Sequence, residues 1–298
     1  RIKPRSCWRS GRPVRPYFEL GKRDGSRTLS GMIHPTAIIH PNARLDPSVQ
    51  VGPYAVIDAG VQLGPECVVG PYVYLTGQTT IGRGNRFFAG CVIGEAPQDL
   101  KYANEPTRLR IGDFNREHVT VHRSNKLSED TVIGSHNFLM QHSHVAHNVC
   151  LGNHVILAGG ALLAGHVTVG DRAFISGNCL VHQFVRVGTL ALMQGGSAIS
   201  KDLLPYTVAH GYNGICGLNT VGLRRAGISA EERLELKQLY HALFHQGRGF
   251  RQALAEAAGR FTSSPARTLL DFAASAKRGL CFDTTGRPGK GKNPEPSD

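Results

Sequence analysis

Apolar residues recur at every sixth position along most of this chain, and a glycine often follows them. An amphipathic helix needs apolar residues every three or four positions and a half-buried strand needs alternation, so this period fits neither. The apolar positions form two runs, Ile33, Ile39, Leu45, Val51, Ile57, Leu63, Val69, Leu75, Ile81, Phe87 and Ile93, then Ile133, Leu139, Val145, Leu151, Leu157, Leu163, Val169, Ile175, Val181, Val187, Met193 and Ile199.

This period predicts short strands joined by tight turns, with three six-residue units forming one triangular coil. Stacked coils bury a continuous core that no single unit can bury. We therefore predict an all-β left-handed parallel β-helix built from hexapeptide repeats. The fifth position of each unit is usually small, and Cys67, Cys91 and Cys179 occupy it. We expect these three thiols to fill the core.

Two segments interrupt the period, and a different pattern follows it. Residues 95–110 and 123–131 do not fit the repeat, and insertions in a solenoid must loop outward, where they often carry function. Ser229 and Glu232 have the spacing of a capping box, which predicts a helix that ends at Gly247.

Two more helical patterns lie near 249–259 and 265–277, so the C-terminal part is expected to be helical. The composition after residue 283 is typical of disorder. The expected parts are a disordered or non-native extension at 1–31, a β-helix domain at 32–204, a C-terminal α-helical domain at 205–282 and a disordered tail at 283–298.

The formal net charge of +12 is unevenly distributed along the chain. Residues 1–31 hold nine Lys/Arg and two Asp/Glu, which leaves about +5 for the rest. We interpret this extension as translated upstream sequence before Met32, with an organelle transit segment as the alternative. A mildly basic body suits an acidic or phosphorylated partner, and nucleic-acid binding is poorly supported.

Seven cysteines, an odd number without a CxxC pair, indicate reduced thiols and a cytoplasmic location. The longest apolar run, at 155–165, is shorter than the roughly 20 residues that a transmembrane helix needs. We therefore expect no transmembrane segment.

Histidines are concentrated in "MQHSHVAHN", at residues 140–148. Because three six-residue units make a coil, position n lies one layer from n+18, at the parallel-strand spacing of about 4.8 Å. His147 is then beside Gly165, with Gln183 beyond it, and His166 stacks on Asn148. A histidine beside a glycine N–H offers a base next to an oxyanion donor.

A zinc site is the alternative interpretation of this histidine cluster. It needs three converging ligands. Counted by layers, His142 has Ser124 and Gly160 as neighbours and His147 has Glu129 on its N-terminal side, so no third histidine is in register. We expect no metal. The five-residue spacing of the two histidines still matches γ-class carbonic anhydrases, so a zinc-dependent hexapeptide protein stays an alternative.

Several motifs follow one another along the chain, and they are "GEAPQDLKYANEPTRLRIGD", "VTVHRS", "HSHVAHN", "LAGHVTVGD", "VHQFVRVG" and "GLNTVGLRRAGIS". In order and spacing they resemble the UDP-N-acetylglucosamine O-acyltransferases of lipid A biosynthesis, from about Ile33 to Gly279. The resemblance implies a homotrimeric enzyme that transfers an R-3-hydroxyacyl chain from acyl carrier protein to the 3-hydroxyl of UDP-N-acetylglucosamine. The acyl carrier protein thioester is the activated donor, so no cofactor is implied.

The resemblance also implies roles for individual residues. His147 matches the general base and Gly165 the backbone donor to the oxyanion. The implied substrate-binding residues are Asp99 and Lys101 for the sugar, His122, His144, His166 and His182 around the nucleotide sugar, Gln183 near the thioester, and Asn219, Arg224 and Arg225 for the nucleotide and its phosphates.

Three departures from the family pattern affect these expectations. Asn148 stands where many relatives have Asp, so we expect reduced catalysis and a higher kcat in Asn148→Asp. The segment 111–122 is about two residues short, which makes its coil irregular. Ala226 replaces an arginine, so phosphate contact rests on Arg224 or Arg225.

Three alternatives stay open beside the O-acyltransferase and the zinc protein. They are the related N-acyltransferase of the same pathway, a 3-amino sugar nucleotide as acceptor, and a trimeric scaffold without activity. The acyl chain length does not follow from the residues.

Overall fold

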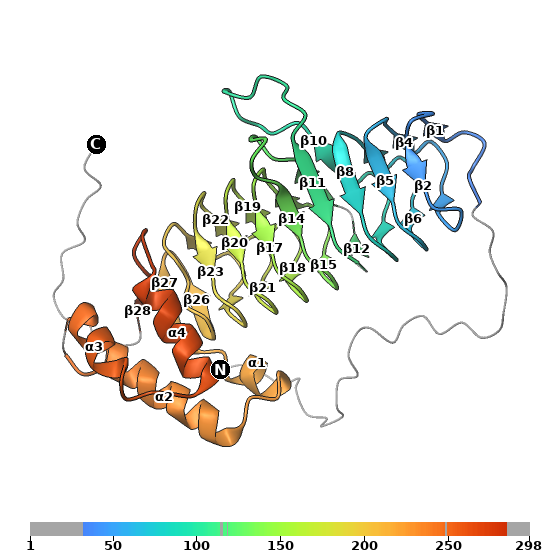
Figure 1. The fold of residues 1–298 in the computed structure, drawn as a ribbon. Helices are drawn as coiled ribbons and strands as arrows, with labels where there is room; N and C mark the ends of the chain where they lie inside the picture. The colour runs from blue at the N-terminus through green and yellow to red at the C-terminus, as the bar shows by residue number, and fades with distance from the viewer. Residues whose placement is uncertain (1–31, 114–115, 118, 248, 285–298) are drawn as a thin grey trace, which may run out of the picture. The chain divides into compact units, whose positions relative to one another are not determined.

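The computed structural model describes residues 32–284 except 114, 115, 118 and 248 (Figure 1). The expectations for the extension at 1–31 and for residues 285–298 lie outside the described residues. Short strands repeat along the chain and stack into three sheets, which are the three faces of a solenoid.

The strands of each sheet follow one another in sequence order. The first sheet contains β1 (Ile38–Ile39), β4 (Val56–Ile57), β7 (Tyr74–Leu75), β10 (Val92–Glu95), β13 (Val119–His122), β16 (Ser143–Val145), β19 (Leu162–Leu163), β22 (Leu180–Val181) and β25 (Ala198–Ile199). The second contains β2 (Arg44–Leu45), β5 (Val61–Leu63), β8 (Gln78–Ile81), β11 (Arg108–Ile111), β14 (Thr131–Ile133), β17 (Cys150–Leu151), β20 (Thr168–Val169) and β23 (Arg186–Val187). The third contains β3 (Gln50–Val51), β6 (Val68–Val69), β9 (Arg86–Phe87), β12 (Arg116–Glu117), β15 (Phe138–Leu139), β18 (Ile156–Leu157), β21 (Phe174–Ile175), β24 (Leu192–Met193), β26 (Thr207–His210), β27 (Gly214–Leu218) and β28 (Phe282–Asp283).

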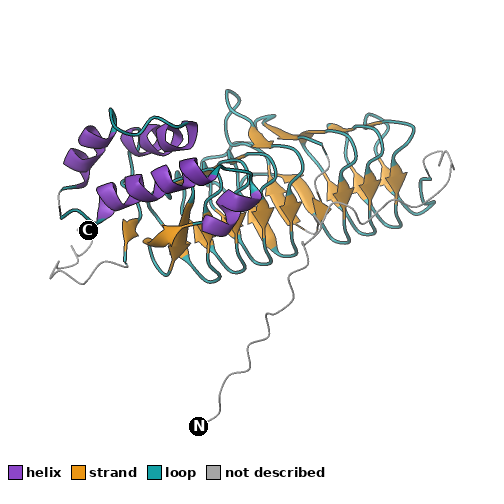
Figure 2. Cartoon of the chain, turned by 90° about the horizontal axis from the view of Figure 1, so that it is seen from below, coloured by secondary structure: helices purple, strands orange, loops and turns teal. Residues whose placement is uncertain are grey.

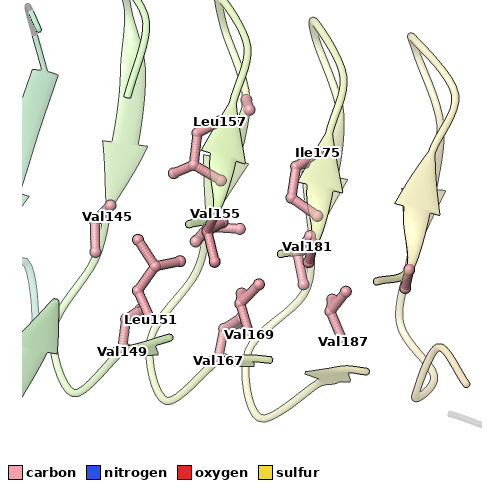
Figure 3. Close-up of a cluster of buried hydrophobic side chains, with 14 of the residues drawn as sticks. Val145, Val149, Leu151, Val155, Leu157, Val167, Val169, Ile175, Val181 and Val187 are labelled. Carbon is pink, nitrogen blue, oxygen red and sulfur yellow. The ribbon is translucent and has the colours of Figure 1, made fainter. Parts of the chain in front are cut away.

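The register of these sheets confirms the predicted parallel β-helix. In the regular coils, each strand residue pairs with the residue three hexapeptide units further on, as in Leu163 with Val181 and Leu151 with Val169. Ile33, at the N-terminal end of the solenoid, is exposed, whereas from Val51 onwards the periodic apolar residues are buried in the space between the sheets (Figure 3). The thiols of Cys67, Cys91 and Cys179 are fully buried there, as predicted.

The register changes around the two insertions. Arg116 pairs with Phe138, and Val119 pairs with Ser143. The step from Arg116 to Val119 is shorter by two positions than the step between their partners, so two residues are missing between β12 and β13. The predicted irregularity of this coil is therefore confirmed. The loop between β10 and β11 projects away from the strands (Figure 1).

The changed register makes the layer count from His142 to Ser124 wrong. His144 pairs with Thr120, which lies further back in the chain than three hexapeptide units, so Ser124 is not a strand-register neighbour of His142. The cause is the segment between β13 and β14, which adds residues that no repeat pattern counts. Strands β14 and β17 keep the 18-residue register, as in Val132 with Cys150, and this register relates Glu129 to His147 as predicted.

Helices lie beside the C-terminal strands (Figure 2), and the described residues form four of them. The predicted capping box is confirmed, because Ser229 Oγ accepts from Glu232 N and the Glu232 carboxylate accepts from Ser229 N. The longest helix ends at Phe244 rather than at Gly247, and the first helix was not predicted. The helices are α1 (Thr220–Arg225), α2 (Ala230–Phe244), α3 (Phe250–Ala257) and α4 (Ser264–Ala274).

Arg186 of β23 joins the solenoid to α4. Its guanidinium pairs with Asp202 at 2.8 Å, donates to Phe272 O at 3.1 Å and lies over the Phe272 ring.

The third sheet continues beyond residue 204 through β26, β27 and β28. Asp283, at the start of the expected disordered tail, therefore lies in a strand. No helix among the described residues has the length and apolar character to cross a membrane.

Candidate active site

A cavity of about 510 Å³ lies along the first sheet and brings together five of the predicted site residues. These are His122, His144, His147, Gly165 and His182. The other lining residues are largely apolar, and they are Gln98, Ala146, Leu162, Leu163, Ala164, Leu180, Val181, Ala198, Ile199, Ser200 and Tyr212. The site therefore combines a row of imidazoles with an apolar groove.

The predicted neighbourhood of His147 and Gly165 is present. A Cβ atom at residue 165 would lie 2.6 Å from His147 Cε1 and 2.7 Å from Nε2, so only glycine fits against this ring. His166 N donates to His147 O at 3.0 Å, and Phe184 N donates to Gly165 O at 3.0 Å, which fixes the layers. Within the described chain, the Gly165 N–H has no hydrogen-bond acceptor and can serve a ligand.

Asn148 determines which nitrogen of His147 carries the proton. The backbone N–H of Asn125 donates to Asn148 Oδ1 at 3.0 Å, and Asn148 Nδ2 donates to Ser124 Oγ at 2.7 Å. The amide orientation is thus fixed by its partners. His147 Nδ1 lies 3.0 Å from the same Oδ1, so Nδ1 must be the donor. His147 Nε2 is then the basic nitrogen.

His122 and His144 meet edge to face in the cavity, with ring centroids 5.0 Å apart. His144 Nδ1 is hydrogen-bonded to Thr120 Oγ1 at 2.7 Å. Burial lowers the pKa of His144 to about 4, with smaller contributions from His122 and His147. Burial also lowers the pKa of His122. Both rings are therefore neutral near pH 7 and act as hydrogen-bonding groups.

The low pKa of His144 predicts a pH-dependent stability. An unfolded histidine takes up its proton near a pKa of about 6.5, whereas folded His144 does so near 4. The unfolded chain binds more protons between these values, so stability is lost as the pH falls from about 6.5 towards 4. We expect the Tm of the wild type to be lower at pH 5 than at pH 7. We expect this difference in Tm to be smaller in His144→Gln.

The control for this measurement is His40→Gln, which changes an exposed histidine. It should lose as much Tm as the wild type when the pH is lowered. An equal loss in His144→Gln would show that His144 is not responsible for the pH dependence.

The projecting loop places Asp99 near the histidines. Its carboxylate accepts from Lys101 N at 3.0 Å and from Asn125 Nδ2 at 2.6 Å, and these bonds lower the pKa of Asp99 in that order. The Lys101 side chain is exposed. The loop thus holds a fixed carboxylate and carries an exposed lysine two residues further on.

His166 and the 182–183 segment complete the surroundings of His147. The His166 ring contacts His147 edge to face at 5.3 Å and stacks on Phe184 at 4.6 Å. The predicted layer relation of His166 to Asn148 is kept by the 18-residue register of the strands on either side, and the ring itself makes these two contacts. His182 lines the cavity with its Nδ1 3.2 Å from Gln183 O, and the Gln183 side chain is exposed.

Three predicted residues lie away from this cavity within the chain. Asn219 caps α1, because its Oδ1 accepts from Gly222 N and its Nδ2 donates to Leu190 O, both at 2.9 Å. Arg224 and Arg225 are exposed at the end of α1. Arg224 lines a separate cavity of about 440 Å³.

The sequence reasoning did not identify several lining residues. Leu162, Leu180 and Ala198 pair in succession with His144 along the first sheet, so the layer count contains a signal for them. Arg278 Nη2 lies 3.5 Å from His182 Nδ1, and no periodic signal marks it. In the part of the chain that is described, no three His, Cys, Asp or Glu side chains are grouped to hold a metal ion.

Comparisons with known proteins show the family of the chain. The family described as UDP N-acetylglucosamine O-acyltransferase, domain 2, matches residues 202–281, and the bacterial transferase hexapeptide family matches residues 130–165. The acyl-[acyl-carrier-protein]–UDP-N-acetylglucosamine O-acyltransferase of Akkermansia muciniphila is 49% identical over 84% of this chain and 98% of its own. That of Myxococcus xanthus is 44% identical over 83% of this chain and 98% of its own.

Solved structures show the same relationship. The UDP-N-acetylglucosamine acyltransferase from Campylobacter jejuni has a TM-score of 0.79 at 33% identity and covers 84% of this chain and 99% of its own. The Francisella novicida enzyme has a TM-score of 0.82 at 31% identity and covers 85% of this chain and 95% of its own. On these similarities, the chain belongs to the acyl-[acyl-carrier-protein]–UDP-N-acetylglucosamine O-acyltransferase family.

Proposed function

We propose that this chain transfers an R-3-hydroxyacyl group from acyl carrier protein to the 3-hydroxyl of UDP-N-acetylglucosamine, the first step of lipid A biosynthesis. One observation carries the proposal most directly. His147 Nε2 is held in its basic form by the Nδ1 contact to Asn148, and its ring lies against Gly165, whose N–H has no acceptor among the described residues. The family's reaction needs this combination.

In the proposed reaction, His147 Nε2 takes the proton of the sugar hydroxyl as its oxygen attacks the thioester carbon. A neutral imidazole suits this role because a sugar hydroxyl is a very weak acid. The thioester oxygen becomes negative, and the Gly165 N–H donates to it. The tetrahedral intermediate then collapses, the C–S bond breaks, and the carrier thiolate takes the proton. The thioester is already activated, so the reaction needs no cofactor.

We assign the other residues in the cavity and around it to the binding of the two substrates. Asp99 and Lys101 suit the sugar and its phosphates, and neutral His122 and His144 hydrogen-bond the nucleotide sugar. His166, His182 and Gln183 flank the reacting groups, while Leu162 and Leu180 give the acyl chain an apolar surface. The mildly basic body suits acyl carrier protein, which is acidic.

We also propose a homotrimer with active sites between neighbouring prisms. Asn219, Arg224 and Arg225 do not line the His147 cavity of their own chain. A neighbouring copy that supplies this segment would bring two arginines to the nucleotide phosphates. The mass of the assembly and the activity of mixed trimers test this arrangement.

We propose a cytoplasmic location for the enzyme. Among the described residues, Cys67, Cys150, Cys179, Cys216 and Cys281 are free thiols. Such thiols are typical of a reducing compartment, and the acyl carrier protein donor is a cytoplasmic protein in this family.

The substrates are tested by an acyl-transfer assay on the full chain with UDP-N-acetylglucosamine, its 3-amino analogue and carrier proteins bearing 3-hydroxyacyl chains of several lengths. We expect transfer to the N-acetylglucosamine nucleotide, unchanged by a chelator, with one preferred chain length. Transfer to the amino analogue alone would identify the N-acyl product instead. Activity abolished by the chelator would restore the zinc alternative.

A further inference from the structure

Glu129 lies behind the His147–Asn148 pair, in the segment between β13 and β14. Its Oε2 accepts from Asn148 Nδ2 at 3.1 Å and lies 3.8 Å from His166 Nδ1. Its Oε1 is 3.3 Å from Lys126 Nζ. Sequence reasoning placed Glu129 only as a layer neighbour of His147, a relation that the register of β14 and β17 keeps, and did not identify its contact with Asn148.

The contacts form a chain that leads from the base to this carboxylate. His147 Nδ1–H donates to Asn148 Oδ1, and Asn148 Nδ2–H donates to Glu129 Oε2. The Asn148 amide cannot turn over without losing its bonds to Asn125 N and Ser124 Oγ. The Asn148 side chain is buried, so the link runs through the protein rather than through solvent.

We propose that Glu129 is a positioning residue that supplies, through the Asn148 amide, the negative charge that stabilises the imidazolium form of His147 during acyl transfer. The inference rests on the proposed function. It explains how a chain with Asn148 provides the charge that an aspartate provides when it directly follows the catalytic histidine.

The Glu129 carboxylate acts by polarising the Asn148 amide, and no second proton is transferred. When His147 Nε2 accepts the hydroxyl proton, the ring becomes positive, and the neutral amide can only offer a dipole. A carboxylate at the far side of the amide orients and strengthens that dipole. About half of the Glu129 side chain is exposed, at 48%, so solvent screens its charge and the effect is moderate.

The same contacts revise the expectation for Asn148→Asp. In the wild type, Asn148 Nδ2 donates to Glu129. An aspartate would replace this donor by an oxygen and place two carboxylates together, which repel or share a proton. We therefore expect the single variant to have no higher kcat than the wild type.

The first test compares Glu129→Gln with the wild type in the full chain, by the pH dependence of kcat/KM for acyl transfer. Glutamine keeps an oxygen that accepts from Asn148, so geometry is retained and only the charge is removed. Because the charge favours the protonated base, its loss should move the acid limb to lower pH. The loss of the charge should also lower the highest kcat/KM of the pH profile about three- to tenfold. The difference in kcat/KM between Glu129→Gln and the wild type should be smaller at high salt.

The control is Asp130→Asn, which removes the same charge from the next residue. Asp130 pairs with Arg108 and Arg110, and we expect the acid limb to stay in place. Other groups near the base remain in both variants, and they are Asp99, His122, Lys126, His144 and His166.

The second test is the exchanged pair Asn148→Asp with Glu129→Gln, which keeps the charge but moves it next to His147. We expect the double variant to exceed the Asn148→Asp single variant by about threefold or more in kcat. A purely structural role for Glu129 predicts that the double variant recovers no kcat and that the acid limb of Glu129→Gln stays where it is in the wild type. Either result would overturn the inference. Absence of transfer by the wild type would instead reject the proposed function.

Discussion

Replacing His147 with alanine is expected to lower kcat for acyl transfer by about three orders of magnitude. The reason lies in the geometry around the ring. His147 Nδ1 is committed to Asn148, Nε2 is the basic nitrogen, and the ring lies against Gly165 in the cavity. The neighbouring histidines cannot take over, because burial lowers the pKa of His144 and His122 and makes them weaker bases.

The variant is measured by steady-state kinetics, with thermal unfolding as the check on folding. The matched control is His142→Asn, which changes an exposed histidine of the same coil. His142 has a φ of 59°, and asparagine tolerates that left-handed conformation better than alanine does. The control should keep kcat. Nearly normal kcat in a folded His147→Ala protein would mean that another group is the base.

Gly165→Ala is expected to lower kcat by at least about a hundredfold, the usual cost of one lost oxyanion donor. The new methyl group would lie 2.6 to 2.7 Å from His147 ring atoms, so the ring or the coil must move. Either displacement separates the base from the N–H that serves the thioester oxygen. KM for the sugar nucleotide should change much less than kcat.

Gly177→Ala is the control for this substitution. The nearest atom to a Cβ there is Gly159 O at 3.2 Å, away from the histidines. We expect it to keep kcat within a few fold, with a Tm no lower than that of Gly165→Ala. If Gly165→Ala retained full kcat, the oxyanion donor would have to be another group.

The layer arithmetic worked where the coils are regular and failed where loops intervene. From His147 onwards no residues are inserted, so the count correctly placed Gly165 in the next coil. Before His147, the segment between β13 and β14 and the two missing residues after β12 change the register. Loop lengths carry no periodic signal, so no count through them is valid.

The structure also revealed contacts that depend on the conformation of single loops. The approach of Arg278 to His182 joins residues that no repeat relates, and the bond between Asn148 and Glu129 depends on side-chain directions that a layer count does not give. Short α1 was missed because six residues carry too little amphipathic pattern to be distinguished from a turn. Motif order, by contrast, identified the family, since several motifs had to match at once.

The most direct test of the account is the product that the full chain forms from UDP-N-acetylglucosamine and R-3-hydroxyacyl carrier protein. Mass spectrometry identifies an acylated sugar nucleotide, and hydroxylamine distinguishes an ester, which it cleaves, from an amide. We predict a hydroxylamine-labile product that the wild type makes and His147→Ala does not. A stable amide product, or equal ester formation by both proteins, would contradict O-acyl transfer with His147 as the base.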